Sequence, residues 1–185
     1  MVRFCMVRFS TERFSAAGSW IIRTPMPVLA VKDLLTTLPP NGRVIGIDPG
    51  SKTIGLALSD VRRRLATPYA SLKRRKLSDN AAEIGQIALR EGAFGLIIGL
   101  PLSMDGTAGP AAQAARDWTH ALSAALGLPA ALWDERLSSA AVNRVLIEDA
   151  DLSRAKRAAA VDRAAAAWML QSALDAAAEG DADAP

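Results

Sequence analysis

With 185 residues, half of them hydrophobic, the chain is long enough for one well-buried core and too short for two full α/β domains. A single cysteine and a single histidine exclude an internal disulfide framework, a thiolate metal cluster and a histidine-rich zinc site. The formal net charge of +3 permits a polyanionic partner, no apolar run is long enough to span a membrane, and a reducing, cytoplasmic setting fits.

Residues 1–27 differ in character from the rest of the chain. They contain a small repeat, MVRF-C-MVRF-S-TERF, whose arginines recur every five residues and therefore match neither a helix nor a strand. An arginine-rich, acid-poor start can indicate an organellar transit peptide. The simpler interpretation is a disordered extension, or a start codon placed too far upstream with Met26 as the true start. Residues 28–42 are expected to form a short helix, at 28–38, and a linker.

The stretch Arg43–Asp60, RVIGIDPGSKTIGLALSD, predicts a β-hairpin. Proline and glycine in 49–52 favour a tight turn between apolar strands at 44–47 and 53–58. Asp48 lies at the buried end of the first strand, where a carboxylate is costly to desolvate unless something compensates its charge. A metal ligand, a phosphate-loop anchor and a turn-capping residue are the possible explanations.

Apolar runs and helical periodicity alternate along the rest of the chain. The continuous apolar run FGLIIGL is typical of a strand covered on both faces, and Ser78 or Asp79 is expected to cap the helix before it. The expected fold class is α/β, a single domain at 43–178 with a mixed five-stranded sheet flanked by helices, followed by a flexible tail at 179–185. We expect strands at 44–47, 53–58, 67–72, 94–100 and 129–133, and helices at 78–90, 110–127, 138–147 and 155–178.

Three carboxylates on separate elements are expected to meet at the carboxyl ends of the strands. They are Asp48, one of the pair Asp134 and Glu135, and Asp162, whose helical neighbours are small apolar residues. Alternation places Asp134 and Glu135 on opposite faces, so which of them is the ligand stays open. Such oxygen ligands suit Mg²⁺ or Mn²⁺, and one or two ions of this kind can support phosphodiester hydrolysis. Asp162 as a helix N-cap is the alternative.

Basic residues cluster in two short runs that predict phosphate contacts, with ordinary solvated surface as the alternative. The candidate nucleic-acid-binding residues are Arg62, Arg63, Arg64, Lys73, Arg74, Arg75 and Lys76. The loop after residue 100 is expected to close over the substrate, where Asp105 could position a water or simply form the turn. The candidate supporting or substrate-contacting residues are Lys52, Asp105, Asp134, Arg136 and Lys156.

Four motifs together resemble one family. VIGIDPGSKTIGLALSD, GLIIGLPLSMDGT, LWDERLSSA and AKRAAAVDRAAAAWMLQ, in this order, are similar to the YqgF/RuvX family of pre-16S rRNA nucleases, which are related to Holliday-junction resolvases. The resemblance implies an RNase H-like fold and trimming of the 5′ end of pre-16S rRNA. It places the family's acidic site on Asp48, Glu135 and Asp162. Residues before Met26 have no counterpart in the family pattern.

The sequence is also compatible with other functions. The turn after Asp48 also resembles the first phosphate loop of actin-like and sugar-kinase ATPases, but the second copy of that fold is missing. A non-catalytic nucleic-acid-binding module would not need the acids. The main rival is a resolvase acting on four-way DNA junctions, and the protein could be a monomer or a homodimer. Few aromatic residues are available to stack on bases, so the backbone of RNA or branched DNA should be what is recognised.

Overall fold

The computed structural model describes residues 28–101, 109–134 and 154–182, and its core is one six-stranded mixed sheet with the strand order β1-β6-β5-β2-β3-β4. The elements are β1 (Val28–Leu29), α1 (Val31–Thr37), β2 (Arg43–Asp48), β3 (Thr53–Ser59), β4 (Ala66–Lys73), α2 (Leu77–Glu91), β5 (Ala93–Leu100), α3 (Pro110–Leu126), β6 (Ala130–Asp134) and α5 (Arg154–Ala182).

The strands follow two connection patterns. β2, β3 and β4 form an antiparallel meander, whereas β2, β5, β6 and β1 are parallel neighbours. Short turns suffice in the meander, while the parallel strands require crossovers, which α2 and α3 supply. As a result, one end of the sheet holds the last residues of β2, β4, β5 and β6 and the first residue of β3. We call it the acid end, because Asp48 lies there.

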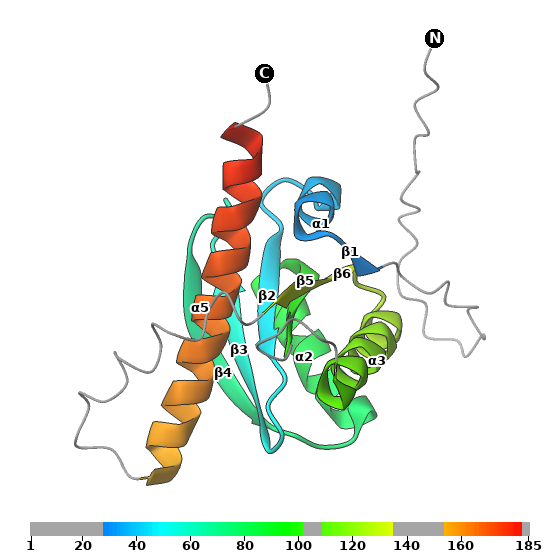
Figure 1. Cartoon of the computed structure of the whole chain (residues 1–185), viewed down its shortest axis with the longest axis vertical. Coiled ribbons are helices and arrows are strands. Elements are labelled where there is room, and N and C mark those ends of the chain that lie inside the picture. Colours follow the sequence, from blue (N-terminus) through cyan, green and yellow to red (C-terminus); the bar gives the residue numbers. More distant parts are fainter. Residues whose placement is uncertain (1–27, 102–108, 135–153, 183–185) are drawn as a thin grey trace.

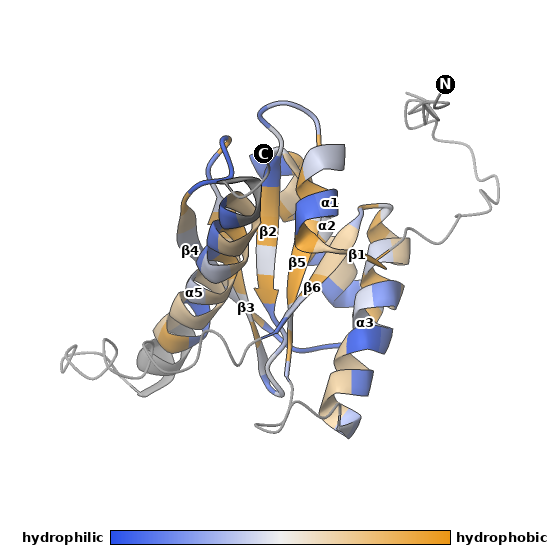
Figure 2. Cartoon of the chain, turned by 45° about the horizontal axis from the view of Figure 1, so that its top comes forward, coloured by the Kyte–Doolittle hydropathy of each residue, from blue (hydrophilic) through white to orange (hydrophobic). Residues whose placement is uncertain are grey.

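Helices cover both faces of the sheet (Figure 1). On one face α1 and α5 pack over a cluster that includes Val44, Ile97 and Leu170. On the other face α2 and α3 pack over Ile47 and Ile98. The strands are mostly hydrophobic and the blue, hydrophilic residues lie on the outer sides of the helices and in the turns (Figure 2). The alternation of side chains along each strand thus fills two separate layers of core.

Two glycines allow α5 to approach the sheet closely. A Cβ atom at Gly46 would lie 2.7 Å from Cβ of Leu170, and one at Gly55 would lie 2.1 Å from the carbonyl oxygen of Asp162. Only residues without a side chain leave room for such contacts. The helix is therefore seated directly on β2 and β3 near the acid end.

Most of the expected elements are confirmed, and the differences have local causes. The five expected strands are present, and a sixth, β1, pairs with Ala130 and Ala131 over only two residues, too few for a periodic pattern. α1 then begins at Val31, and its Leu34 is fully buried in the core. α5 continues to Ala182, beyond the expected end, and the helix expected at 138–147 lies outside the described residues.

The expected cap of α2 is wrong. The helix begins at Leu77 after Lys76, and no side chain caps it. The buried Asn80 instead links the helix to the end of β4, because its amide oxygen accepts from the backbone N–H of Arg75 and its amide nitrogen donates to the carbonyl of Lys73. A polar side chain one turn inside the helix therefore orders the connection.

Candidate active site

Asp48 is the last residue of β2 and lies at the acid end of the sheet. Its neighbour Ile47 packs under α2 and α3, so alternation turns Asp48 to the other face, the one that α5 covers. Asp48 pairs in register with Gly55, the residue against which the backbone of Asp162 packs. The strand pairing and the seat of α5 therefore bring the two expected carboxylates together.

Two hydroxyl groups hold the carboxylate of Asp162. The Thr53 hydroxyl donates to Oδ2 of Asp162 over 2.6 Å, and the Ser71 hydroxyl lies 3.5 Å from the same oxygen. Thr53 begins β3 and Ser71 lies on β4. The antiparallel meander therefore fixes the side chain of Asp162, which lies more than 90 residues later in the sequence. The other carboxylate oxygen accepts no hydrogen bond from the described residues.

The electrostatics of the site favour a cation. Burial, and second the negative charge of Asp162, raise the pKa of Asp48 to about 6 from an ordinary value of 3.8. Both causes penalise the charged form of Asp48. A divalent cation would offset both, and carboxylate oxygens are the ligands that Mg²⁺ and Mn²⁺ prefer. The donor set present in the described residues therefore fits such an ion.

Asp134 lies at the same end of the sheet but turns to the other face. It pairs in register with Leu100 at the end of β5. Its neighbour Trp133 packs in the cluster under α5, while Leu132 packs in the cluster under α2 and α3. By alternation Asp134 shares the face of Leu132, away from Asp48. Asp134 does have an interaction partner of its own.

The third expected carboxylate ligand, Glu135, lies outside the described residues. No group of three or more histidine, cysteine, aspartate or glutamate side chains that could hold a metal lies within 28–101, 109–134 and 154–182. Glu135, Asp105 and Arg136 lie outside these ranges. Lys156 belongs to α5, but its side chain is not described, and Lys52 is exposed in the turn after Asp48.

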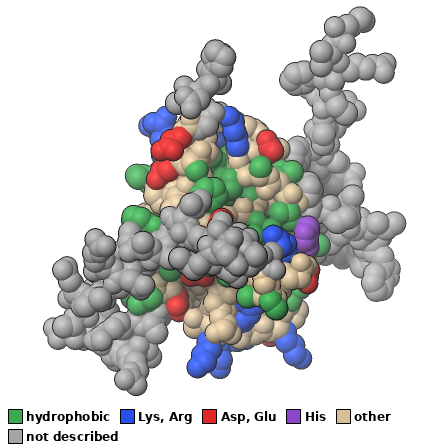
Figure 3. Space-filling view, in the orientation of Figure 1, with side chains coloured by type: hydrophobic (Ala, Val, Ile, Leu, Met, Phe, Trp, Pro, Cys, Tyr) green, Lys and Arg blue, Asp and Glu red, His purple; other side chains and the backbone are tan. Residues whose placement is uncertain are grey.

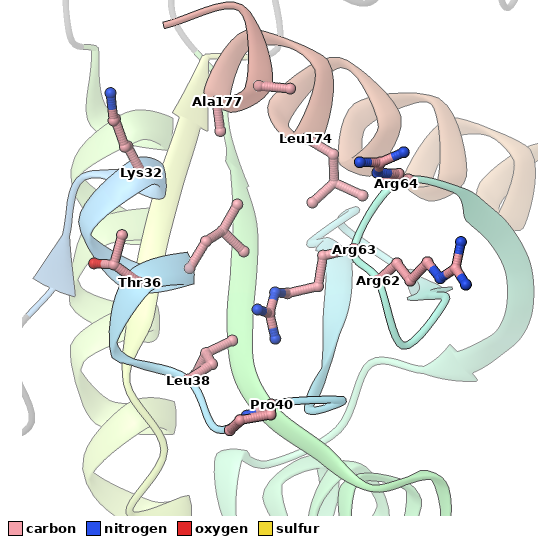
Figure 4. Close-up of a pocket in the computed structure, with 11 residues that line it drawn as sticks. Lys32, Thr36, Leu38, Pro40, Arg62, Arg63, Arg64, Leu174 and Ala177 are labelled. Atoms are coloured by element: carbon pink, nitrogen blue, oxygen red, sulfur yellow. The ribbon is translucent and has the colours of Figure 1, made fainter. Parts of the chain in front are cut away.

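The structure separates the two basic runs. Arg62–Arg64 occupy the turn between β3 and β4, at the end of the sheet opposite the acid end. There they line a hollow of about 610 Å³ between α1 and the last turns of α5. Arg63 points toward Leu38 and Pro40 in Figure 4, and its guanidinium donates to the carbonyls of Pro39 and Gly42. Arg62 points away from these residues in the same view.

The second run, Lys73–Lys76, follows β4 at the acid end. Lys73, Arg75 and Lys76 are exposed, whereas Arg74 is half-buried. Figure 3 shows Lys and Arg side chains at both the upper and the lower ends of the molecule, which correspond to the opposite end and the acid end in turn. Only the second run thus lies at the same end as Asp48 and Asp162.

Comparison with known proteins identifies the family. Residues 42–176 match the RuvX family, which is described as Holliday junction resolvase. The chain belongs to the RuvX family. The match confirms the resemblance seen in the four motifs. The mixed sheet with helices on both faces confirms the expected α/β class.

Relatives of this RuvX chain align with about four-fifths of it and are themselves covered almost completely. A protein of Acidiphilium cryptum is 67% identical over 150 residues, covering 81% of this chain and 94% of the relative. A protein of Gluconacetobacter diazotrophicus is 62% identical over 154 residues, covering 83% and 100%. Both carry the name "Putative pre-16S rRNA nuclease". Among solved structures, Thermus thermophilus RuvC in complex with a Holliday junction substrate aligns with a TM-score of 0.45 and 16% identity, covering 73% of this chain and 94% of that chain.

Sequence reasoning missed the two hydroxyl groups that hold Asp162 in the RuvX chain. Thr53 and Ser71 are ordinary strand residues in the sequence, and nothing in their spacing points to Asp162. Thr53 could have been suspected from its place two residues before Gly55, since a glycine in a strand marks close approach of another segment.

Within the described ranges, no helix has the length and apolar character needed to cross a membrane.

Proposed function

We propose that the RuvX chain is a divalent-metal-dependent endonuclease that trims the 5′ end of pre-16S rRNA in the cytoplasm. Its nuclease class follows from the family and from the names of the relatives. The observation that carries the chemistry is the pair Asp48 and Asp162, brought together at the acid end with the pKa of Asp48 raised. We assign this activity to a domain spanning residues 43–178.

We propose Glu135 rather than Asp134 as the third ligand. Asp134 shares the face of Leu132, on the other side of the sheet from Asp48 and Asp162, so it is poorly placed to bind a metal with them. The four-motif resemblance to the family points to Glu135. Asp48, Glu135 and Asp162 would together hold Mg²⁺ or Mn²⁺. When bound, one or two such ions activate the attacking water and stabilise the leaving oxygen of the phosphodiester.

The chain's own groups orient this site and bind the substrate. Thr53 and Ser71 donate to one oxygen of Asp162 and so leave the other directed elsewhere. Lys73, Arg75 and Lys76 offer exposed positive charge at the acid end, which suits the phosphates of an RNA strand without reading its bases. Lys52 adds an exposed charge in the turn beside Asp48.

The test is cleavage of a precursor. A 16S rRNA fragment with its 5′ extension is incubated with purified protein and Mg²⁺, and the new 5′ end is mapped at nucleotide resolution. We expect the mature end with wild-type protein, and no cleavage with Asp48→Asn or in EDTA. Robust cleavage in EDTA would overturn the metal requirement.

A four-way DNA junction is the second candidate substrate, because the family is described as Holliday junction resolvase. The same protein is therefore offered an immobile junction under the same conditions, and the protein is depleted in its host. Accumulated untrimmed precursor with normal recombination supports the RNA substrate. Normal rRNA ends with a repair defect, together with symmetric junction cleavage in vitro, would favour the junction, and such cleavage would be expected from a homodimer.

A further inference from the structure

Arg74 is bonded to the turn that carries Asp48. Its Nη1 atom donates to the carbonyl oxygens of Pro49 and Gly50, each over 3.1 Å. Its backbone N–H donates to the carbonyl of Lys52 over 2.9 Å. One residue at the end of β4 therefore fixes three residues of the turn between β2 and β3.

The same guanidinium is covered on one side by an aromatic ring. Its central carbon lies 5.4 Å from the ring centroid of Trp118, which is half-buried on α3 and packs against the core under α2 and α3. A cation over the face of a tryptophan is attracted by the ring, more strongly when water is partly excluded. Arg74 is thus held between the turn and α3.

These contacts set Arg74 apart from the rest of its run. Lys73, Arg75 and Lys76 are exposed, and the guanidinium of Arg75 forms an exposed ion pair with Glu83. We propose that Arg74 is a positioning residue that fixes Asp48 relative to Asp162, and that it does not bind phosphate as the other three do. The inference rests on the proposed function: its kinetic consequences need the nuclease activity, whereas its effect on Mn²⁺ affinity needs only the proposed metal site at Asp48 and Asp162.

The turn between β2 and β3 affects the positions of both Asp48 and Asp162. Asp48 precedes it, and Thr53, which donates to Asp162, follows it. A shift of the turn therefore changes the distance between Asp48 and the Thr53–Asp162 pair. Misplacement of reacting groups by about 1 Å can cost roughly 100-fold in rate. Lysine can replace Arg74 only in part, since its compact ammonium can donate to a carbonyl but lacks the planar guanidinium that lies over the Trp118 ring while Nη1 donates to two carbonyls.

The test compares Arg74→Gln with Arg75→Gln, which removes the same charge one residue away. For Arg74→Gln we expect kcat to fall about 10- to 100-fold, with KM for RNA and the salt dependence of binding little changed. For Arg75→Gln we expect the reverse: a higher KM and a log–log salt slope reduced by roughly one. Trp118→Leu should show the Arg74 pattern in weaker form, and Arg74→Lys should rescue kcat only in part.

A second measurement does not depend on cleavage. Calorimetric titration of the RNA-free protein with Mn²⁺ should show weaker binding in Arg74→Gln than in Arg75→Gln, by about tenfold. Equal Mn²⁺ affinity in the two variants, or a salt slope that falls in Arg74→Gln with kcat unchanged, would overturn the inference. If wild-type protein binds Mn²⁺ but cleaves no RNA, the proposed function fails while the Mn²⁺ comparison still decides the role of Arg74. Should Arg74→Gln not fold, Arg74→Lys and Trp118→Leu carry the same two measurements.

Discussion

Replacing Asp48 by asparagine should stabilise the metal-free protein while abolishing cleavage. Burial and the charge of Asp162 raise the pKa of Asp48 to about 6, so the folded protein binds this proton more tightly than the unfolded chain does. Above that pH the folded state carries an unfavourable charge. Asparagine has nearly the same shape and no charge, so it removes the penalty without leaving a cavity.

The size of the effect follows from the two pKa values. The difference between about 6 in the folded protein and 3.8 in the unfolded chain is about two units, and each unit corresponds to about 1.4 kcal/mol. Ionisation of Asp48 therefore costs about 3 kcal/mol at most. Because the pKa of Asp48 is higher in the folded protein, tighter binding of its proton stabilises the fold, and this stabilisation is complete below pH ~4. It is lost as the pH rises to about 6 and does not return at higher pH.

Urea unfolding in EDTA, repeated between pH 4 and pH 8, measures this difference. Asp48→Asn should be more stable than wild type by about 2–3 kcal/mol at pH 8 and equal to it near pH 4. Addition of Mg²⁺ should stabilise the wild type and leave the variant unchanged. A variant that is less stable than wild type, or a difference that does not depend on pH, would refute the reasoning.

Asp60 provides a control of opposite sign. Its carboxylate accepts backbone N–H groups from Leu65, Arg64 and Arg62, and these bonds, that of Leu65 foremost, lower its pKa. Because the pKa of Asp60 is lower in the folded protein than in the unfolded chain, its charge stabilises the fold at pH values above the ordinary pKa. This stabilisation is lost as the pH falls. Asp60→Asn should therefore be less stable than wild type at neutral pH, and the two should converge in acid.

Three further predictions concern the packing and the ligands of the site. In thermal melts, Gly55→Ala should destabilise the protein by about 3 kcal/mol, because the new Cβ meets a backbone oxygen of α5, and it should abolish cleavage. Gly85→Ala is the control: its Cβ meets only a side-chain carbon of Leu126, so this variant should be neutral or stabilising. Thr53→Val should weaken Mn²⁺ binding in calorimetry by about 10- to 100-fold, since Asp162 loses its short hydrogen bond. Activity lost in EDTA should return with Mg²⁺ or Mn²⁺ but not with Ca²⁺, whose longer bonds and looser geometry suit the site less well.

Local pattern was enough to predict five of the six strands and to select Asp48 and Asp162 as candidates. Strands β2, β3 and β5 stand out as apolar runs. Asp48 ends a strand whose preceding four residues are buried, and Asp162 lies on a helix among small apolar residues. Their convergence could be expected because working groups gather at the carboxyl ends of strands. Gly55 then provides the close approach that no periodicity reveals, since it depends on which helix lies over it.

The roles of the basic residues could not be predicted from local pattern. Arg74 contacts Trp118, a residue 44 positions later on another element, so its burial and bonding are purely tertiary. Asn80 is a similar case, because a buried amide linking a helix to a strand end has no signature beyond its residue type. The antiparallel hairpin does, however, predict where the first basic run lies. The turn that follows β3 must lie opposite the turn that precedes it, which separates Arg62–Arg64 from the acids.

This separation leads to a prediction about substrate binding. β2 has six residues, and at about 3.3 Å per residue the two ends of the sheet lie roughly 20 Å apart. A short RNA bound at the acid end therefore contacts Lys73 and Lys76 but not Arg62 or Arg64. Arg63 is left out of the comparison because its guanidinium is already bonded to the backbone of Pro39 and Gly42.

Two double variants, Lys73→Gln with Lys76→Gln and Arg62→Gln with Arg64→Gln, lower the net charge equally and differ only in place. With a short single-stranded RNA, the first should reduce the log–log salt slope of binding by roughly one to two units, because each phosphate contact contributes about 0.7 for a single strand. The second should leave the slope unchanged. Equal reductions would mean that net charge, not position, governs binding, and a larger reduction from the arginine pair would place the RNA over the opposite end and away from Asp48.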